Sequence, residues 1–224
     1  MERKIITTGD GSVTIYLKEW DEQYHSKHGA IQEAKHVFIK MGLDYWRENF
    51  VQKDINILEI GFGTGLNAFI TFLEAERHQL KIDYTGVEAY PIAQNEIAAL
   101  NYPELLSAEN QNEIFQEMHA IPWNRSQFIS EAFKLTKQQK RFEEIDDIAK
   151  YELVFFDAFG ARVQPELWTE EIFEKMYVAM QEKAVLVTYA AKGSVRRAMQ
   201  KAGFFVERLP GPPGKREMLR ALKN

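Results

Sequence analysis

The residues with the clearest chemical potential lie in the stretch NILEIGFGTGLNAFITFLEAE, residues 56–76. Gly61, Gly63 and Gly65 alternate with other residues between an apolar run and a helix-like pattern. A glycine turn between a strand and a helix lets a ligand approach the backbone and the N–H groups of the helix start. The stretch therefore predicts a ligand-binding loop.

The residues after the glycines do not match two common phosphate-binding loops. A P-loop needs Lys and Ser or Thr after its last glycine, but Leu66 and Asn67 follow Gly65. A dinucleotide fingerprint needs a glycine at its sixth position, which here is Leu66. Glu59 followed by alternate glycines instead resembles the first motif of class I S-adenosylmethionine-dependent methyltransferases, whose glycines admit the amino-acid and sugar parts of the cofactor.

Two more acidic residues end predicted strands. Glu88 lies 23 residues after Gly65, where a carboxylate can accept both ribose hydroxyls. An NAD enzyme places an acid similarly, so Glu88 indicates a nucleoside without choosing the cofactor. Asp157 ends the buried run YELVFF, at the sheet edge where doubly wound folds bind ligands. Glu59, Glu88 and Asp157 can each also be read as strand-end carboxylates with a purely structural role.

Aromatic residues follow Asp157 in the chain. Phe159 and Trp168 could stack on a flipped-out base. A tryptophan at a helix start is as often part of the core, so both interpretations stay open.

The apolar patterns indicate which elements carry these residues. Residues 4–19 read as two short strands around a Gly-Asp-Gly turn, and residues 30–50 have helical spacing. From Ile55 strands and helices alternate, and the last two strands form a hairpin. This order predicts an α/β fold with a parallel doubly wound sheet and an antiparallel edge. The polar stretch 133–150 could hold one more strand, which the pattern does not place.

Composition excludes several chemistries. The 224 residues contain no cysteine, which excludes disulfides, thiolate metal sites and a cysteine nucleophile. No metal site is expected, because His25, His28 and His36 do not form a convincing ligand set. No apolar run approaches the roughly 18 residues of a membrane span, and the first residues lack the apolar core of a signal peptide. We therefore expect a cytoplasmic protein without membrane association.

Charge is distributed unevenly along the chain. The formal net charge is −5, but residues 184–224 hold nine basic and two acidic residues, a local charge of +7. Such a segment can present a positive face to a polyanion, although solvated helix and strand surfaces explain it equally well. If RNA lies across it, Lys215 and Arg216, after the turn-rich LPGPPG, are expected to contact phosphates together with Arg196 and Arg197.

Five ordered motifs carry a resemblance to a known family over nearly the whole chain. HGAIQEAKHVFI, LEIGFGTGLN, FFDAFGARVQPELWT, SVRRAMQKAGF and PGKREML resemble the tRNA 5-aminomethyl-2-thiouridine methyltransferases. That family comprises the methyltransferase domain of the bifunctional protein MnmC and the stand-alone MnmD type. The resemblance implies a class I, Rossmann-like methyltransferase domain at 51–224, with a C-terminal antiparallel β-hairpin, preceded by a hairpin and helix extension at 1–50.

The resemblance also implies an activity. S-adenosylmethionine would methylate the exocyclic amine of 5-aminomethyl-(2-thio)uridine at the tRNA wobble position, giving the 5-methylaminomethyl form. Asp157 would be the catalytic acid that orients the amine and helps it reach the neutral form. The cofactor residues would be Glu59, Gly61, Gly63, Gly65, Asn67 and Glu88. The substrate-side candidates are Gly29, Glu33, His36, Phe159, Trp168, Lys215 and Arg216.

The chain departs from the family in one motif. The bifunctional members have DGFAP where this chain has DAFGA, so Ala158 replaces a glycine and Ala161 a proline. This changes the expected detail of the loop but keeps the aspartate.

The chain ends at Asn224, without room for the FAD-dependent oxidase domain of the bifunctional protein. We therefore expect the stand-alone form, with separate enzymes supplying the aminomethyl-uridine. Three other readings remain open: a methyltransferase for another RNA nucleoside or a small molecule, an aminopropyltransferase on the same fold, and a non-catalytic RNA-binding module.

Overall fold

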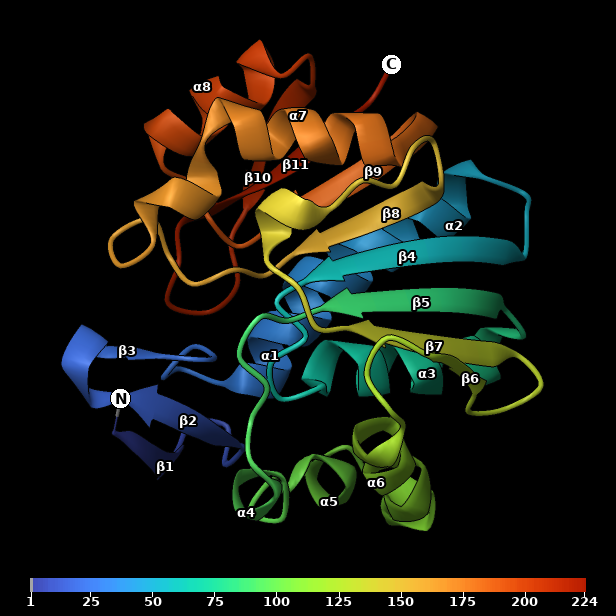
Figure 1. The fold of residues 1–224 in the computed structure, drawn as a ribbon, viewed down its shortest axis with the longest axis vertical. Coiled ribbons are helices and arrows are strands. Elements are labelled where there is room, and N and C mark those ends of the chain that lie inside the picture. The colour runs from blue at the N-terminus through green and yellow to red at the C-terminus, as the bar shows by residue number, and fades with distance from the viewer. Residues whose placement is uncertain (1) are drawn as a thin grey trace.

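The computed structural model describes residues 2–224 and arranges them around an eight-stranded sheet (Figure 1). The strand order is β10-β11-β9-β8-β4-β5-β7-β6. The five strands from β9 to β7 pair in parallel, and β10, β11 and β6 pair antiparallel. The predicted parallel sheet with a C-terminal hairpin is confirmed. The strands are β4 (Asp54–Ile60), β5 (Lys81–Val87), β6 (Ser126–Phe128), β7 (Phe133–Gln138), β8 (Tyr151–Phe156), β9 (Met180–Thr188), β10 (Phe205–Pro210) and β11 (Glu217–Leu222).

The strand that the sequence did not place is β7, and β6 pairs with it at the edge opposite the hairpin. Phe133, Leu135 and Lys137 are the buried positions of β7. A lysine at an inward position weakens the apolar alternation by which a strand is recognised. The Lys137 ammonium is accommodated because it donates to the His119 carbonyl at 2.5 Å and lies 4.8 Å from the centre of the Trp123 ring.

Helices cover both faces of the sheet. On one face lie α1 (Ala30–Ala34), a π-helical segment (Lys35–Asp44), α2 (Tyr45–Asn49), α3 (Leu66–His78) and α6 (Asn112–Ala120). On the other lie α7 (Glu170–Ala179) and α8 (Gly193–Lys201). Strand β4 shows why both faces are apolar, since Ile57 packs into the first core and Leu58 into the second. Alternate side chains of a strand point to opposite faces, so a sheet covered by helices on both sides needs apolar side chains on both faces.

The chain from Ala30 to Asn49 forms one continuous helix with wide π-helical turns in the middle. Gly42 lies on the side of this helix that packs against the sheet. A Cβ there would lie 3.0 Å from Val187 and 3.2 Å from Phe155. This helix shares the core of the sheet, although it precedes residue 51. The domain division at residue 50 stays a prediction.

A small sheet stands beside the carboxyl ends of the main strands (Figure 1). It contains β1 (Arg3–Thr7), β2 (Val13–Leu17) and β3 (Glu22–Gln23), and its β1–β2 hairpin was predicted. The Arg3 guanidinium contacts the Glu96 carboxylate at 3.0 Å and so ties the small sheet to α4 (Gln94–Ile97), which is followed by α5 (Tyr102–Leu105). Over residues 2–224, no helix is long and apolar enough to cross a membrane.

Candidate active site

The candidate site lies where the parallel strands β4, β5 and β8 end. Ile60 of β4 pairs with Phe156 of β8, so the chain leaves both strands side by side as Gly61 and Asp157. The Asp157 N–H donates to the Ile60 carbonyl at 2.9 Å. Carboxyl ends of parallel strands are the usual ligand-binding edge of such sheets.

The glycine loop is shaped by close contacts that a side chain would prevent. Gly61 has φ +90°, and a Cβ there would lie 2.7 Å from the Asp157 carbonyl oxygen. Gly63 has φ +48°, and its Cβ would lie 3.1 Å from the Tyr24 ring. Gly61 and Gly63 line the main cavity, whereas Gly65 lies at the start of α3 against His119. The loop thus brings bare backbone to the cavity at two of its three glycines.

Glu88 reaches the glycine loop from the end of β5. Its carboxylate accepts from the Gly63 N–H at 3.1 Å and from the Tyr90 N–H at 2.8 Å. Burial raises the pKa of Glu88, and these backbone hydrogen bonds partly offset the rise. A carboxylate at this loop would repel a pyrophosphate and suits hydroxyl donors such as those of a ribose.

Asn67 joins two acidic side chains from different strands. Its amide donates to Glu59 Oε1 at 2.9 Å and to Asp157 Oδ2 at 2.8 Å. Glu59 is fully buried beneath α3, and burial raises its pKa well above the usual range. Glu59 Oε2 and Asn67 Oδ1 are buried without a partner in residues 2–224. Asn67 lines the cavity, and its unpartnered oxygen is a buried acceptor that an ammonium donor such as that of an amino-acid ligand would satisfy.

The carboxyl group of Asp157 has a raised pKa that suits it to acid–base chemistry near neutral pH. Burial raises the pKa of Asp157 to about 7, and the neighbouring Glu33 charge adds to the rise. The Asn67 hydrogen bond and the Lys215 ammonium oppose it. A carboxylate that titrates near neutrality can accept a proton from an alkylammonium group and release it again.

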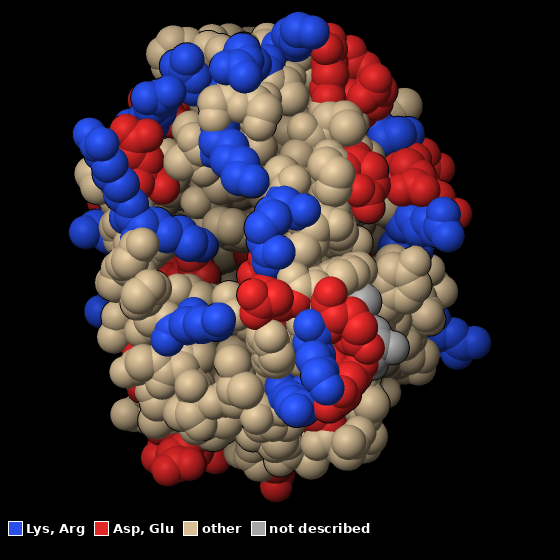
Figure 2. Space-filling view, turned by 90° about the vertical axis from the view of Figure 1, so that its left-hand side faces the viewer, with Lys and Arg blue, Asp and Glu red and all other residues tan. Residues whose placement is uncertain are grey.

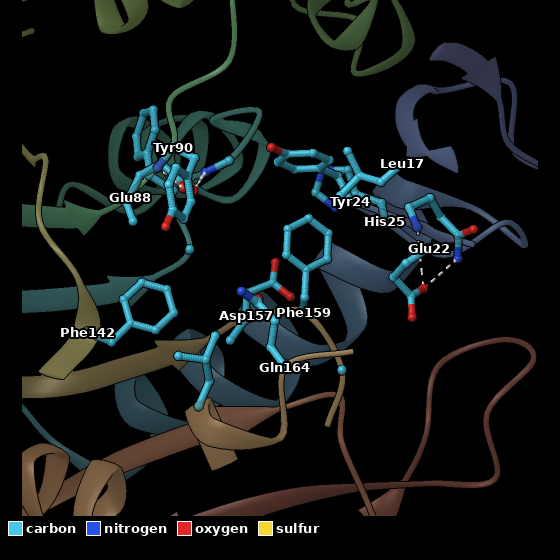
Figure 3. Close-up of a pocket in the computed structure, with 18 of the residues that line it drawn as sticks. Leu17, Glu22, Tyr24, His25, Glu88, Tyr90, Phe142, Asp157, Phe159 and Gln164 are labelled. Atoms are coloured by element: carbon cyan, nitrogen blue, oxygen red, sulfur yellow. Dashed lines mark hydrogen bonds between the residues drawn. The ribbon is translucent and has the colours of Figure 1, made fainter. Parts of the chain in front are cut away.

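A cavity of about 650 Å³ opens between these groups (Figure 3). Asp157 and Phe159 lie at its centre. Glu88, Tyr90 and Phe142 are on one side, and Leu17, Glu22, Tyr24 and His25 from the small sheet and the loop after it are on the other. The Phe159 ring makes edge contacts with Tyr24 at 4.9 Å and Trp20 at 5.6 Å. The amino-terminal segment therefore forms a wall of the cavity.

Trp168 lies behind the cavity. Its side chain is buried against Phe156, Phe173 and Tyr189, and its indole N–H donates to the Phe159 carbonyl at 2.8 Å. The ring face is not open to a base in this structure, so its visible role is to hold the backbone of Phe159.

A second cavity of about 570 Å³ adjoins the first. Glu22, Gly160 and Tyr189 line both cavities, and Lys215 and Arg216 line only the second. The Lys215 ammonium contacts the Glu33 carboxylate directly and lies 3.8 Å from the centre of the Tyr189 ring. Arg216 is exposed. The two predicted substrate-side cations thus have different environments.

The remaining substrate-side candidates lie outside both cavities. Gly29 starts α1, where a Cβ would lie 2.6 Å from the Asp10 carboxylate. His36 Nε2 contacts the Pro210 carbonyl at 2.8 Å. Both residues position the segments that surround Glu33 and Lys215. Within residues 2–224 no cluster of three His, Cys, Asp or Glu side chains could hold a metal ion.

Basic side chains surround the mouth of the site. Figure 2 faces the carboxyl ends of the strands and shows Lys and Arg around a hollow in which acidic side chains are visible. Not all of the basic C-terminal segment contributes. Arg220 and Lys223 are buried, Arg220 against Glu207 and Lys223 at the Met180 carbonyl, whereas Lys192, Arg197 and Arg216 are exposed.

Several cavity residues were not found from the sequence. Tyr189 directly follows β9, the next parallel strand, and could have been found by the rule that selected Asp157. Tyr24, His25 and Phe142 carry no such signal, because long-range packing alone brings their segments to the cavity. The His25 ring contacts the Thr64 hydroxyl at 2.7 Å, and burial lowers the pKa of His25 to about 4.

Curated relatives match most of this chain but are much longer. It is 29% identical over 219 residues to the tRNA 5-methylaminomethyl-2-thiouridine biosynthesis bifunctional protein MnmC of Nitrosospira multiformis, covering 92% of this chain and 34% of that protein. It is 32% identical over 232 residues to the protein of the same name from Aromatoleum aromaticum, covering 97% of this chain and 35% of that protein. The chain therefore spans about a third of the length of these relatives.

Solved structures show the same fold. MNMC2 from Aquifex aeolicus superposes with a TM-score of 0.78 at 27% identity, covering 98% of this chain and 70% of that chain. Spermidine synthase from Thermotoga maritima superposes with a TM-score of 0.57 at 14% identity, covering 99% and 68%, and this likeness concerns the fold alone.

The sequence pattern of one family matches residues 110–224, half of the chain. This is a family of S-adenosyl-L-methionine-dependent methyltransferases. The glycine loop, Glu88 at that loop and Asp157 at the strand end are consistent with such an activity. The chain belongs to the S-adenosyl-L-methionine-dependent methyltransferase family.

Proposed function

We propose that this protein methylates the primary amine of 5-aminomethyl-(2-thio)uridine at the wobble position of tRNA. The observation that carries the proposal is Asp157, a half-buried carboxyl group at the end of β8 and beside the glycine loop, whose pKa is raised to about 7. Similarity over 92% of the chain to proteins named for 5-methylaminomethyl-2-thiouridine biosynthesis supports this substrate.

The residues of the cavity fit the family's cofactor. Glu88 would accept the ribose hydroxyls, Gly61 and Gly63 would let the cofactor approach the backbone, and Asn67 Oδ1 would accept from its ammonium group. Bound S-adenosylmethionine supplies an activated methyl group. Glu59 would act through Asn67, whose amide it holds.

The chemistry assigned to this chain is proton transfer and alignment. A protonated amine has no lone pair, so the ammonium must lose a proton before its nitrogen attacks the methyl carbon. Asp157 accepts that proton and holds the nitrogen in line, which are contributions of orientation and of acid–base catalysis. In the balanced reaction the nitrogen gains a methyl group, the carbon–sulfur bond breaks with its electron pair on sulfur, and one proton is released.

The exposed cations around the second cavity would hold the RNA. Lys192 and Arg216 line that cavity, and Arg197 lies on the same helix as Arg196. Phosphate contacts set the position of the RNA, while the target base would enter towards Phe159. We place the protein in the cytoplasm, where the primary amine of the uridine must be exposed before this methylation.

The direct test uses tRNA that carries 5-aminomethyl-uridine and labelled S-adenosylmethionine. We expect nucleoside mass spectrometry to show label in 5-methylaminomethyl-uridine and none with tRNA that lacks the aminomethyl group. Label in another nucleoside would identify that nucleoside as the substrate and reject the proposed one. Methylation of a polyamine instead would reject RNA as the substrate.

Gly63→Asp should abolish cofactor binding while the domain stays folded. The new side chain would meet Tyr24 and place a charge beside Glu88, at a backbone position with φ +48°. Calorimetry with S-adenosylmethionine measures the loss. Gly11→Asp is the matched control, since it puts the same residue at φ +85° where its Cβ would meet only the Leu105 side chain, at an ordinary contact distance of 3.9 Å, and it should bind normally. Normal affinity in folded Gly63→Asp would contradict the loop assignment.

Asp157→Asn should lower turnover by about 100-fold or more, the usual contribution of a positioned acid–base group. In the wild type we expect turnover to fall as the pH drops through about 7, because Asp157 then takes up a proton and can no longer accept one. The variant should lose this dependence. Asp83→Asn, which removes a partly exposed carboxylate paired with Lys134, is the control. If the turnover of Asp157→Asn still falls as the pH drops through about 7, Asp157 is excluded as the base.

Lys192→Ala with Arg216→Ala should weaken tRNA binding and lower its salt slope by roughly 1.5, since each phosphate contact contributes about 0.7–0.9. Affinity for S-adenosylmethionine should not change. The control pair, Lys53→Ala with Lys81→Ala, removes two exposed charges at the opposite end of the parallel strands. If both double variants show the same slope as the wild type, the RNA binds another face.

A further inference from the structure

Lys215 occupies an unusual position for a residue of a basic surface segment. Its ammonium lies 3.8 Å from the centre of the Tyr189 ring and contacts Glu33. The side chain of Glu33 is 10% exposed, and its other oxygen accepts from the Ser26 N–H at 3.0 Å. A cation over an aromatic face beside a buried carboxylate is a recognised way of binding an ammonium group.

Acidic groups surround the same ring. Tyr189 follows β9, its hydroxyl donates to the Ala158 carbonyl at 2.8 Å, and its pKa is raised first by burial and then by the charges of Asp157, Glu33 and Glu22. Glu22 is already paired with Arg162 at 3.2 Å. Lys215 is thus the cation that balances Glu33 and Asp157.

The position of Lys215 also connects the two cavities. Tyr189 lines both cavities. Asp157 lines only the first, or inner, cavity of about 650 Å³, and Lys215 lines only the second, or outer, cavity of about 570 Å³. Lys215 is carried by the connection between β10 and β11, whose Gly211 N–H and Arg216 carbonyl close a turn at 3.1 Å. A side chain that enters from the outer cavity towards Asp157 therefore meets the Lys215 ammonium.

We propose that the Tyr189 ring, with Glu33 and Asp157, forms a binding site for a primary alkylammonium group, which Lys215 fills in the free protein and the substrate amine takes over. The inference extends the proposed function, because the substrate proposed there carries such a group. The exchange replaces one cation by another, so the buried carboxylates stay balanced. It favours an amine over a neutral group of the same size, because a neutral group would leave the carboxylates unpaired.

The test uses Lys215→Ala and methylammonium chloride, without RNA or S-adenosylmethionine. Removal of the lysine side chain should open the site, and methylammonium should bind at least about 10-fold more tightly than to the wild type. Thermal unfolding measures this, because a ligand of the native state raises the midpoint. Sodium chloride at equal ionic strength serves as the salt control.

Two further variants decide what the probe binds. Arg216→Ala removes the neighbouring exposed charge and should bind methylammonium as weakly as the wild type does. Lys215→Ala with Glu33→Gln should lose the gained affinity. If Lys215→Ala does not fold, Lys215→Gln removes the charge but keeps part of the stem, and the same comparison applies.

The outcomes separate this inference from the proposed function. Equal methylammonium affinity in wild type and Lys215→Ala, or full affinity in the double variant, would overturn the ammonium site. Neither result bears on the methylation of tRNA, which is tested separately by the assay with labelled S-adenosylmethionine. The opposite combination is also informative. If Lys215→Ala binds methylammonium through Glu33 but the wild-type protein methylates no tRNA, the ammonium site is supported and only the proposed substrate is rejected.

Discussion

The parallel pairing of β4 with β8 is the constraint on which the site depends. Its register places Ile60 opposite Phe156, so the glycine loop and Asp157 start from adjacent backbone positions. The two segments can lie this close only because Gly61 has no side chain, since a Cβ would meet the Asp157 carbonyl at 2.7 Å. Asn67, the second residue of α3, then reaches both Glu59 and Asp157.

Burial of acidic groups gives the site its chemistry. A carboxylate in water would be a poor base for an alkylammonium, because its ordinary pKa lies several units below neutrality. Burial raises the pKa of Asp157 to about 7, and Asn67 and Lys215 limit the rise. The same burial would be costly without compensation. The amide of Asn67, the backbone N–H groups at Glu88 and the contact of Lys215 with Glu33 supply it.

Both ends of the chain complete a site whose centre comes from the sheet. The small amino-terminal sheet and the loop after it bring Leu17 and Tyr24 to the inner cavity, and the connection before β11 brings Lys215 to the outer one. Glu33 on α1 and Lys215 meet although 182 residues separate them. Glu33 and Lys215 belong to two of the five family motifs, HGAIQEAKHVFI and PGKREML, which lie near opposite ends of the chain and meet beside the second cavity.

The sequence by itself determined the features that local patterns encode. Alternating strands and helices predicted the parallel sheet and its hairpin, and the glycine spacing predicted a loop that Glu88 reaches. Asp157 was found because a polar residue that follows an apolar strand lies at the ligand-binding edge. β6 and β7 were not placed, since Lys137 occupies an inward position whose burial depends on the His119 carbonyl and the Trp123 ring. Only the tertiary structure decided that Trp168 is buried, that Tyr189 lines both cavities and that Lys215 faces Glu33 while Arg216 faces solvent. A side chain's type and spacing limit what it can do, but its partners come from segments far away in the chain, and no local pattern encodes them.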